Sequence, residues 1–153
     1  PGWRPQEARR AALLIAEAEA SVAHAELIDQ ATAASESYRA ALAFGRQASS
    51  AKLVASLDIL RRTRAGVTRA LAHVDAIILP TEPYRAFPHG QGTGARQGDF
   101  TTLASIAGLP ALALPWPASD GGLPASVQIV TRPYEEARLV ALAAMMTRRS
   151  DKP

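Results

Sequence analysis

Residues 99–111 read DFTTLASIAGLPA, and this segment combines a short helix, the signal that ends it and the beginning of a strand. The stretch 100–107 is predicted to be helical. Gly108 fits the left-handed cap at the carboxyl end of a helix, and Pro110 cannot continue one. The apolar run 111–114 follows, and we predict a strand that ends at Pro115, because proline lacks the backbone donor that a strand ladder needs.

Two other segments are predicted to be strands that accompany residues 111–114. Residues 76–79 (AIIL) form a short apolar run that Pro80 ends, and residues 125–130 (ASVQIV) alternate small or polar with apolar side chains. Thirty-one residues separate the first two strands, which is enough for a crossover between parallel strands. Residues 120–122 (DGG) supply a turn between the second and third strands, which indicates an antiparallel pair. We therefore expect a short mixed sheet of about three strands.

A final helix is predicted over residues 134–147, with one apolar face made by Leu139, Leu142, Ala143 and Met146. Three strands with buried faces are few for a stable sheet. The strands are therefore expected to belong to a larger sheet, most of which lies outside this sequence.

The first half of the chain is predicted to be helical. Residues 6–44 contain neither Gly nor Pro, and Pro5 suits the first turn of a helix. A break is predicted over residues 32–37, where Thr and Ser side chains can cap helix ends. A further helix is predicted over residues 50–73, because apolar residues recur there at spacings of three and four, with Arg64 filling one missing step: Leu53, Leu57, Leu60, Val67 and Leu71.

Gly66 in this helix indicates either a close approach to a neighbouring element or a local weakening of the helix. We expect one partial domain of the α/β class over residues 1–153. Its helical region covers residues 1–73 and its strand-rich region covers residues 74–153. The first residue is Pro rather than Met, so the sequence is expected to begin inside a longer reading frame or after processing.

Composition narrows the classes of function. The chain has no Cys, which excludes disulfides and thiolate metal sites, and its three histidines are too scattered for a local metal motif, so neither metal nor cofactor is expected. No apolar run approaches the roughly 20 residues that span a bilayer, and a cytoplasmic protein is predicted. The densest basic group, residues 61–64, lacks interleaved aromatic residues, so we expect no nucleic-acid partner.

Four short sequence segments follow one another in the second half of the chain: VDAIILPT at residues 74–81, residues 99–111, GLPASVQIV at 122–130 and RPYEEARL at 132–139. In this order and at these separations they resemble the C-terminal region of the amidase-signature family. The resemblance is specific over residues 74–139 and only suggestive before Gly45. One departure is Ser105, where many members of the family carry Asn.

The resemblance implies a larger α/β enzyme that hydrolyses a carbon–nitrogen amide bond with a serine nucleophile, a second serine and a lysine. In the family these residues lie upstream, and no segment here matches them: the Gly-rich stretch 90–94 has no serine, and neither Lys52 nor Lys152 is in a matching context. We therefore expect no catalytic residue in this chain, which should be inactive alone. The expected partners are the missing N-terminal catalytic portion and a small amide substrate, and a homodimer is left open.

The resemblance also implies where substrate would be contacted in the intact enzyme. The candidate substrate-binding residues form two groups: Pro80 and Thr81, and Asp99, Phe100, Thr101 and Thr102. One hypothesis for Asp99 is that its carboxylate binds a polar substrate group. The alternative for Asp99 is an ordinary cap for the helix that begins near Phe100.

Three alternatives remain at this point. Ser49 and Lys52 have the Ser-x-x-Lys spacing of penicillin-recognising enzymes, but the companion motifs are absent and Ser49 or Ser50 can simply cap the following helix. The chain could also be a non-catalytic binding or structural module that docks through apolar helix faces and an unpaired sheet edge. A small basic nucleic-acid binder is the third, and it predicts affinity that falls steeply with salt.

Overall fold

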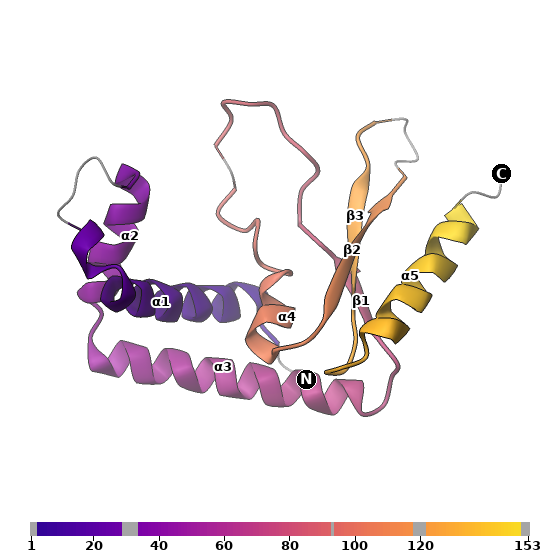
Figure 1. Cartoon of the computed structure of the whole chain (residues 1–153), viewed down its shortest axis with the longest axis horizontal. Coiled ribbons are helices and arrows are strands. Elements are labelled where there is room, and N and C mark those ends of the chain that lie inside the picture. The colour runs from indigo at the N-terminus through magenta and orange to yellow at the C-terminus, as the bar shows by residue number, and fades with distance from the viewer. Residues whose placement is uncertain (1–2, 29–33, 93, 118–121, 151–153) are drawn as a thin grey trace.

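The computed structural model describes residues 3–28, 34–92, 94–117 and 122–150. The elements are, in chain order, α1 (Pro5–Ala23), η1 (Ala25–Leu27), α2 (Glu36–Arg46), α3 (Ser50–Leu71), β1 (Ile77–Pro80), α4 (Thr102–Ala107), β2 (Ala111–Trp116), β3 (Ala125–Val130) and α5 (Glu136–Ser150). Figure 1 shows α1 and α2 at one end, the sheet and α5 at the other, and α3 running along both α1 and α4. The predicted α/β class is confirmed.

Serine side chains begin two of the helices, as predicted. Ser35 precedes α2 and accepts a hydrogen bond from the Tyr38 backbone nitrogen at 3.2 Å, while Ser49 precedes α3 and accepts one from the Lys52 backbone nitrogen at 3.4 Å. These bonds satisfy backbone donors that have no partner within the helix. Ser49 is therefore a helix cap, and the Ser-x-x-Lys spacing is explained without catalysis. The first part of the predicted break, residues 32–33, lies outside the described residues.

Gly45 brings α1 and α2 into close contact. A Cβ atom placed at Gly45 would lie 2.2 Å from the backbone carbonyl carbon and oxygen of Glu17 on α1. Real Cβ atoms do not approach backbone atoms so closely, so any side chain at this position would push the two helices apart. α1 also packs against α3, so α1 lies in contact with both of the other long helical segments at this end of the molecule.

The sheet has the strand order β1-β3-β2, and both described pairs are antiparallel. The prediction of a mixed sheet is therefore wrong for these strands. β1 and β2 do run in the same direction, but β3 lies between them and separates them. The hairpin of β2 and β3 leaves one edge of β3 free, and β1 occupies that edge. The predicted turn at residues 120–122 lies largely outside the described residues, since 118–121 are not described.

Two prolines lie inside strands that they were predicted to end. β1 includes Pro80, and β2 continues through Pro115 to Trp116. Both strands are edges of the described sheet, where a residue without a backbone donor is tolerated because one side of the strand has no partner to satisfy. The third strand, by contrast, has the predicted limits, Ala125–Val130.

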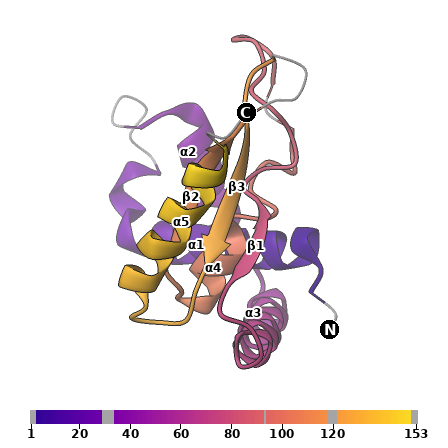
Figure 2. The same cartoon turned by 90° about the vertical axis from the view of Figure 1, so that its right-hand side faces the viewer.

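The two faces of the sheet pack against different helices, as Figure 2 shows from the side. On one face α5 lies over the sheet, and Leu139 and Ala143 pack with Ile129 around a buried cluster that also contacts Leu112, Leu114, Leu142 and Met146. The predicted apolar face of α5 is thus confirmed. On the other face Val67 and Leu71 of α3 and Leu103 of α4 form a second buried cluster, against which Trp3, Ile77 and Leu79 pack.

The predicted apolar face of α3 is correct only in part. Val67 and Leu71 are buried, whereas Leu57 is 45% exposed. Arg64, which interrupts the apolar spacing, donates to the backbone carbonyl of Ile106 from Nε at 3.2 Å and from Nη2 at 3.1 Å. A cation at the carboxyl end of a helix is favoured by the helix dipole, so Arg64 anchors α4 to α3.

Among the residues that the structure describes, none of the helices combines the length and the hydrophobicity needed to cross a membrane.

Candidate functional site

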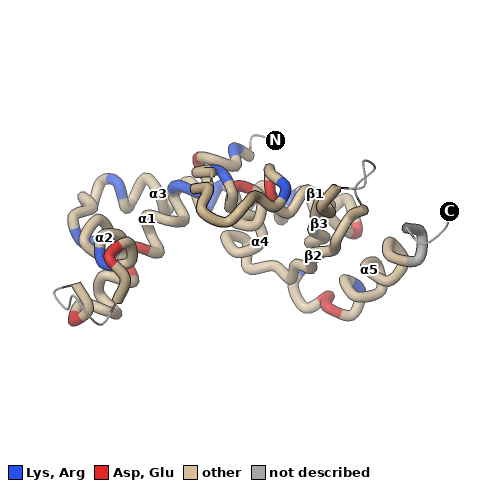
Figure 3. The backbone as a smooth tube through the Cα atoms, turned by 90° about the horizontal axis from the view of Figure 1, so that it is seen from above, with Lys and Arg blue, Asp and Glu red and all other residues tan. Residues whose placement is uncertain are grey.

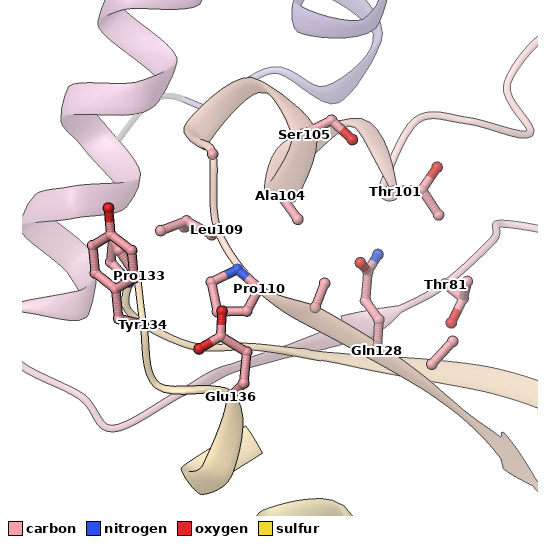
Figure 4. Close-up of a pocket in the computed structure, with 13 residues that line it drawn as sticks. Thr81, Thr101, Ala104, Ser105, Leu109, Pro110, Gln128, Pro133, Tyr134 and Glu136 are labelled. Carbon is pink, nitrogen blue, oxygen red and sulfur yellow. The ribbon is translucent and has the colours of Figure 1, made fainter. Parts of the chain in front are cut away.

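A cavity of about 560 Å³ lies between α4, the sheet and the start of α5 (Figure 4). Its walls come from the second half of the chain. The lining residues are Thr81 after β1, Thr101, Ala104 and Ser105 around α4, Gly108, Leu109 and Pro110 after α4, Ala111, Ala113 and Gln128 of the sheet, and Pro133, Tyr134 and Glu136 near α5.

The sheet provides the floor of the cavity. Ala113 is paired with Gln128 in the antiparallel register, so the two side chains lie on the same face, and the small alanine side chains leave space beside the longer glutamine. Gln128 is buried, and its Nε2 donates to the backbone carbonyl of Pro80 at 3.2 Å. No hydrogen bond from a described residue reaches Oε1, and Figure 4 shows the Gln128 amide directed from the sheet toward Thr101. Gln128 therefore offers a carbonyl oxygen with a fixed position to the cavity.

Hydroxyl groups connect the three strands at one end of the cavity. The hydroxyl of Ser126 donates to the backbone carbonyl of Leu114 at 3.3 Å, and the Thr81 and Ser126 hydroxyl oxygens lie 2.8 Å apart. Because Ser126 has one hydroxyl proton and uses it toward Leu114, Thr81 is the donor in the pair. The Thr81 backbone nitrogen also donates to the Ser126 carbonyl at 2.9 Å. Thr81 is thus held in place at the edge of the sheet.

The end of α4 shapes the opposite wall. Gly108 has φ 67° and ψ 44°, the left-handed cap predicted from the sequence. The backbone nitrogen of Leu109 donates to the Ala104 carbonyl at 3.0 Å, and that of Gly108 donates to the Ser105 carbonyl at 3.3 Å. This cap turns the chain sharply from α4 into β2, so that Ser105 and Pro110 face the same space.

Asp99 does not line the cavity. Its side chain has no exposed surface, and its two carboxylate oxygens lie 2.8 Å from Arg9 Nε and 3.0 Å from Arg96 Nε. Burial alone would raise the pKa of Asp99, but the hydrogen bonds and charges of Arg9 and Arg96 outweigh it and hold the pKa below its ordinary value. Asp99 therefore remains ionised between Arg9 and Arg96. The alternative prediction that it caps α4 is wrong, because no side chain caps that helix.

The other predicted substrate-binding residues divide into two groups. Thr81 and Thr101 line the cavity together. Pro80, Phe100 and Thr102 do not. Pro80 supplies the carbonyl that holds Gln128, the Phe100 ring lies 6.2 Å from the Trp3 ring, and the Thr102 hydroxyl donates to the Gly98 carbonyl.

Sequence reasoning missed several lining residues, and Gln128 is the most informative of them. A polar residue in the alternating run of residues 125–130 was visible, but alternation alone does not show which face of a strand borders a cavity. Tyr134 was also missed. It is 95% exposed and has φ 64°, a left-handed conformation that a residue with a bulky side chain seldom adopts. It lies at the mouth of the cavity with Glu136.

The lining of the cavity is rich in groups that can form hydrogen bonds. It holds hydroxyls, a carboxamide and backbone groups, and Glu136 supplies the single carboxylate among the lining side chains. No group of His, Asp and Glu residues suited to a metal ion occurs within residues 3–28, 34–92, 94–117 and 122–150. Neither His nor Lys is among the lining residues beside the hydroxyls of Thr101 and Ser105. The arrangement can orient a polar, uncharged group.

Comparison with known proteins relates this chain to a known family. The family model described as Amidase matches residues 22–140. One subunit of the glutamyl-tRNA(Gln) amidotransferase from Myxococcus xanthus is 38% identical over 93 residues, which cover 58% of this chain and 19% of that protein. The corresponding protein from Methylocella silvestris is 39% identical over 85 residues, covering 52% of this chain and 17% of that protein.

A solved amidase structure has a TM-score of 0.82 at 25% identity and covers 94% of this chain and 35% of that chain. The structure of a bacterial aryl acylamidase of the amidase-signature family has a TM-score of 0.78 at 15% identity and covers 97% of this chain and 34% of that chain, which shows the fold alone. The present chain thus spans about a fifth of the length of the first curated relative and about a third of each solved chain.

Proposed function

Because the chain belongs to the amidase family, we propose that it is the C-terminal portion of an enzyme that hydrolyses the carbon–nitrogen bond of an amide. In this proposal two serines and a lysine perform the acyl transfer, and they belong to a catalytic portion outside the present chain. The support is the match over residues 22–140, together with a cavity whose lining has no activated nucleophile. The chain alone is expected to be inactive.

The contribution of this chain is to bind and orient the amide. The observation that carries the proposal is Gln128, a buried side chain held by the Pro80 carbonyl with its own carbonyl oxygen left for the cavity. That oxygen can accept a hydrogen bond from the N–H of an amide. Thr101 and Ser105 face it across the cavity and can donate to a substrate oxygen. Thr81 and Thr101 are the predicted substrate-binding residues that this proposal retains.

Charge around the cavity favours neutral substrates or those that carry an amine. Glu136 contributes a negative charge at the mouth, and no Lys or Arg lines the cavity. A carboxylate-bearing amide would meet repulsion there without a compensating cation. We therefore propose a small amide whose group beside Glu136 is uncharged or positive.

The first experiment is to recover the protein from its native source and measure its intact mass, compared with 16.1 kDa for this chain. The recovered species and the isolated chain are then assayed on a panel of aryl and aliphatic amides by release of ammonia or amine. The proposal predicts a much larger species that is active and an isolated chain that is not. Turnover by the isolated chain would contradict the placement of the catalytic residues outside it.

Gln128→Leu in the larger species tests the role of the cavity. The substitution keeps the size of the side chain and removes the acceptor, so KM for the amide should rise by about fivefold to a hundredfold, the loss that one hydrogen bond accounts for. Gln47→Leu, at the exposed end of α2, is the matched control and should leave KM unchanged. Equal kinetics for the two variants would remove Gln128 from the proposal.

A non-catalytic binding or structural module is the second candidate. It is favoured by the two edge strands of the described sheet, β1 and β2, and by Ile78 and Trp116 on them, which are exposed. A native mass near 16.1 kDa would support it. The cytoplasmic location and the homodimer stay predictions.

A further inference from the structure

A second cavity, of about 740 Å³, lies where the start of α1 approaches the carboxyl-terminal half of α3. It shares no lining residue with the candidate functional site, and α4 separates the two, since Leu103 faces the second cavity while Ala104 and Ser105 face the first. Its lining residues are Trp3, Arg4, Glu7, Ile59, Arg62, Thr63, Ala65, Gly66, Val67, Arg69, Ala70, Ile77 and Leu103.

The interior of the second cavity is apolar. Val67 and Leu103 belong to the buried cluster between the helices and the sheet, and Trp3 and Ile77 pack against that cluster. The cavity therefore reaches the hydrophobic core instead of ending on a polar surface. An apolar cavity of several hundred Å³ with a few polar groups at its margin is typical of sites for small organic ligands.

Gly66 keeps the wall of α3 open. A Cβ atom at this position would meet no atom within 4 Å, and the glycine does not have the positive φ that excludes other residues. Neither a close approach nor backbone geometry requires glycine here, although glycine weakens a helix relative to alanine. What the missing side chain leaves is free space beside Val67 and Ala70 in the lining.

The margin of the second cavity is basic. Arg4, Arg62 and Arg69 line it with a single acid, Glu7. Figure 3 shows basic positions on both α1 and α3. Arg62 is paired with Asp58 at 3.2 Å, whereas within the described ranges the side chains of Arg4 and Arg69 make neither an ion pair nor a hydrogen bond. Two guanidinium groups are thus available at the margin of an apolar space.

We propose that the second cavity binds a small amphipathic carboxylate. The apolar body of the ligand packs on Trp3, Val67 and Leu103, and its carboxylate pairs with Arg4 and Arg69. Guanidinium groups favour carboxylates through charge and through parallel hydrogen bonds. An alcohol of the same shape lacks the charge, and an amine is repelled. The site goes beyond amide hydrolysis, because it is built from residues that the proposed amide cavity does not use.

Phenylbutyrate is a suitable probe, with phenylbutanol and phenylbutylamine as matched neutral and cationic compounds. The readout is the fluorescence of Trp3 in the full chain with Trp116→Phe, which leaves one tryptophan. We expect saturable binding of phenylbutyrate with a Kd on the order of 1 mM, weaker in high salt. Phenylbutanol should bind roughly fivefold more weakly and phenylbutylamine more weakly still. No saturable response to phenylbutyrate, or equal affinity for phenylbutanol, overturns the proposal.

Substitutions at Gly66 and at the arginines localise the binding. Gly66→Leu should fold, because its Cβ meets open space and Leu favours helix, and it should weaken binding at least tenfold by filling the cavity. Gly66→Ala adds one carbon atom and should retain binding. Arg69→Gln should weaken binding about threefold, and Arg61→Gln, on the same helix but outside the lining, should not. Undiminished binding by Gly66→Leu overturns the site.

Discussion

Asp99 joins α1 to the segment before α4, far apart in the sequence, and replacing it tests how much that junction stabilises the chain. Arg9 comes from α1 and Arg96 from the segment before α4, and each donates to one carboxylate oxygen. The Asp99 side chain has no exposed surface, whereas 19% of Arg9 and 51% of Arg96 is exposed. Asp99→Ala would leave Arg9 as a mostly buried cation without its partner.

The expected loss follows from these exposures. Removing one partner of a buried ion pair costs about 3–5 kcal/mol, while an exposed pair contributes about 0–1 kcal/mol. The Arg9 pair belongs to the first class and the Arg96 pair is closer to the second. We therefore expect Asp99→Ala to lower the free energy of unfolding by about 3 kcal/mol. Arg96→Ala should lower it by about 0.5 kcal/mol.

The assay is urea unfolding of the full chain followed by circular dichroism at neutral pH, with Arg9→Ala and the double variant completing a cycle. The coupling between Arg9 and Asp99 should be about 2 kcal/mol, clearly larger than that between Arg96 and Asp99. Since the pKa of Asp99 is lowered in the folded state, its stabilisation is present above the unfolded value of about 3.9 and is lost as pH falls through the folded pKa.

The free energy of unfolding of Asp99→Asn should therefore differ from that of the wild type at neutral pH, and the two values should converge in acid. A loss below about 1 kcal/mol for Asp99→Ala would refute the assignment of a buried, stabilising pair, because that is the range of exposed ion pairs. The electrostatic explanation would be refuted if the free energies of unfolding of the wild type and Asp99→Asn differed by a constant amount down to the lowest pH at which the chain folds. In that case the loss would reflect packing alone.

Four further substitutions test local features. In urea titration, Gly45→Ala should lower the free energy of unfolding by about 3 kcal/mol, because its Cβ meets the Glu17 backbone. Gly66→Ala should instead raise the free energy of unfolding by about 0.5–1 kcal/mol. Equal effects of the two substitutions would contradict the close contact at Gly45. Burial raises the pKa of Glu17, so the stability that protonated Glu17 contributes is full below the unfolded pKa and is lost as pH rises through the folded pKa. Glu17→Gln should therefore have a higher free energy of unfolding than the wild type at pH 7, and the two should converge in acid. A variant less stable than the wild type at pH 7 would contradict the raised pKa. Gly108→Ala should cost about 1 kcal/mol from left-handed strain, measured by thermal unfolding, and no loss would argue against the cap.

Local signals in the sequence predicted local structure well. Ser35 and Ser49 mark helix starts, Gly108 marks a helix end, and the alternation in Ala125–Val130 marks a strand. Each of these features depends on the backbone within a few residues, so it is visible in a short stretch of sequence.

Features that depend on distant residues were not predicted. The position of β3 between β1 and β2 is determined by pairing between segments that no short pattern connects, and this made the mixed sheet wrong. Asp99 is another case, since its partner Arg9 lies 90 residues away and nothing near Asp99 in the sequence indicates it. Thr81 and Thr101, which line the cavity, were candidates through a family resemblance, whereas Gln128 required knowledge of which sheet face borders the cavity.

The alternation of side chains along β2 and β3 separates two roles by sequence position. Ala113 and Gln128 border the cavity, and their neighbours Leu112, Leu114 and Ile129 pack toward α5. A mutation at one set of positions changes the cavity without entering the packed layer beneath α5. The cavity and the packed layer can therefore be altered independently, although the same two strands carry both.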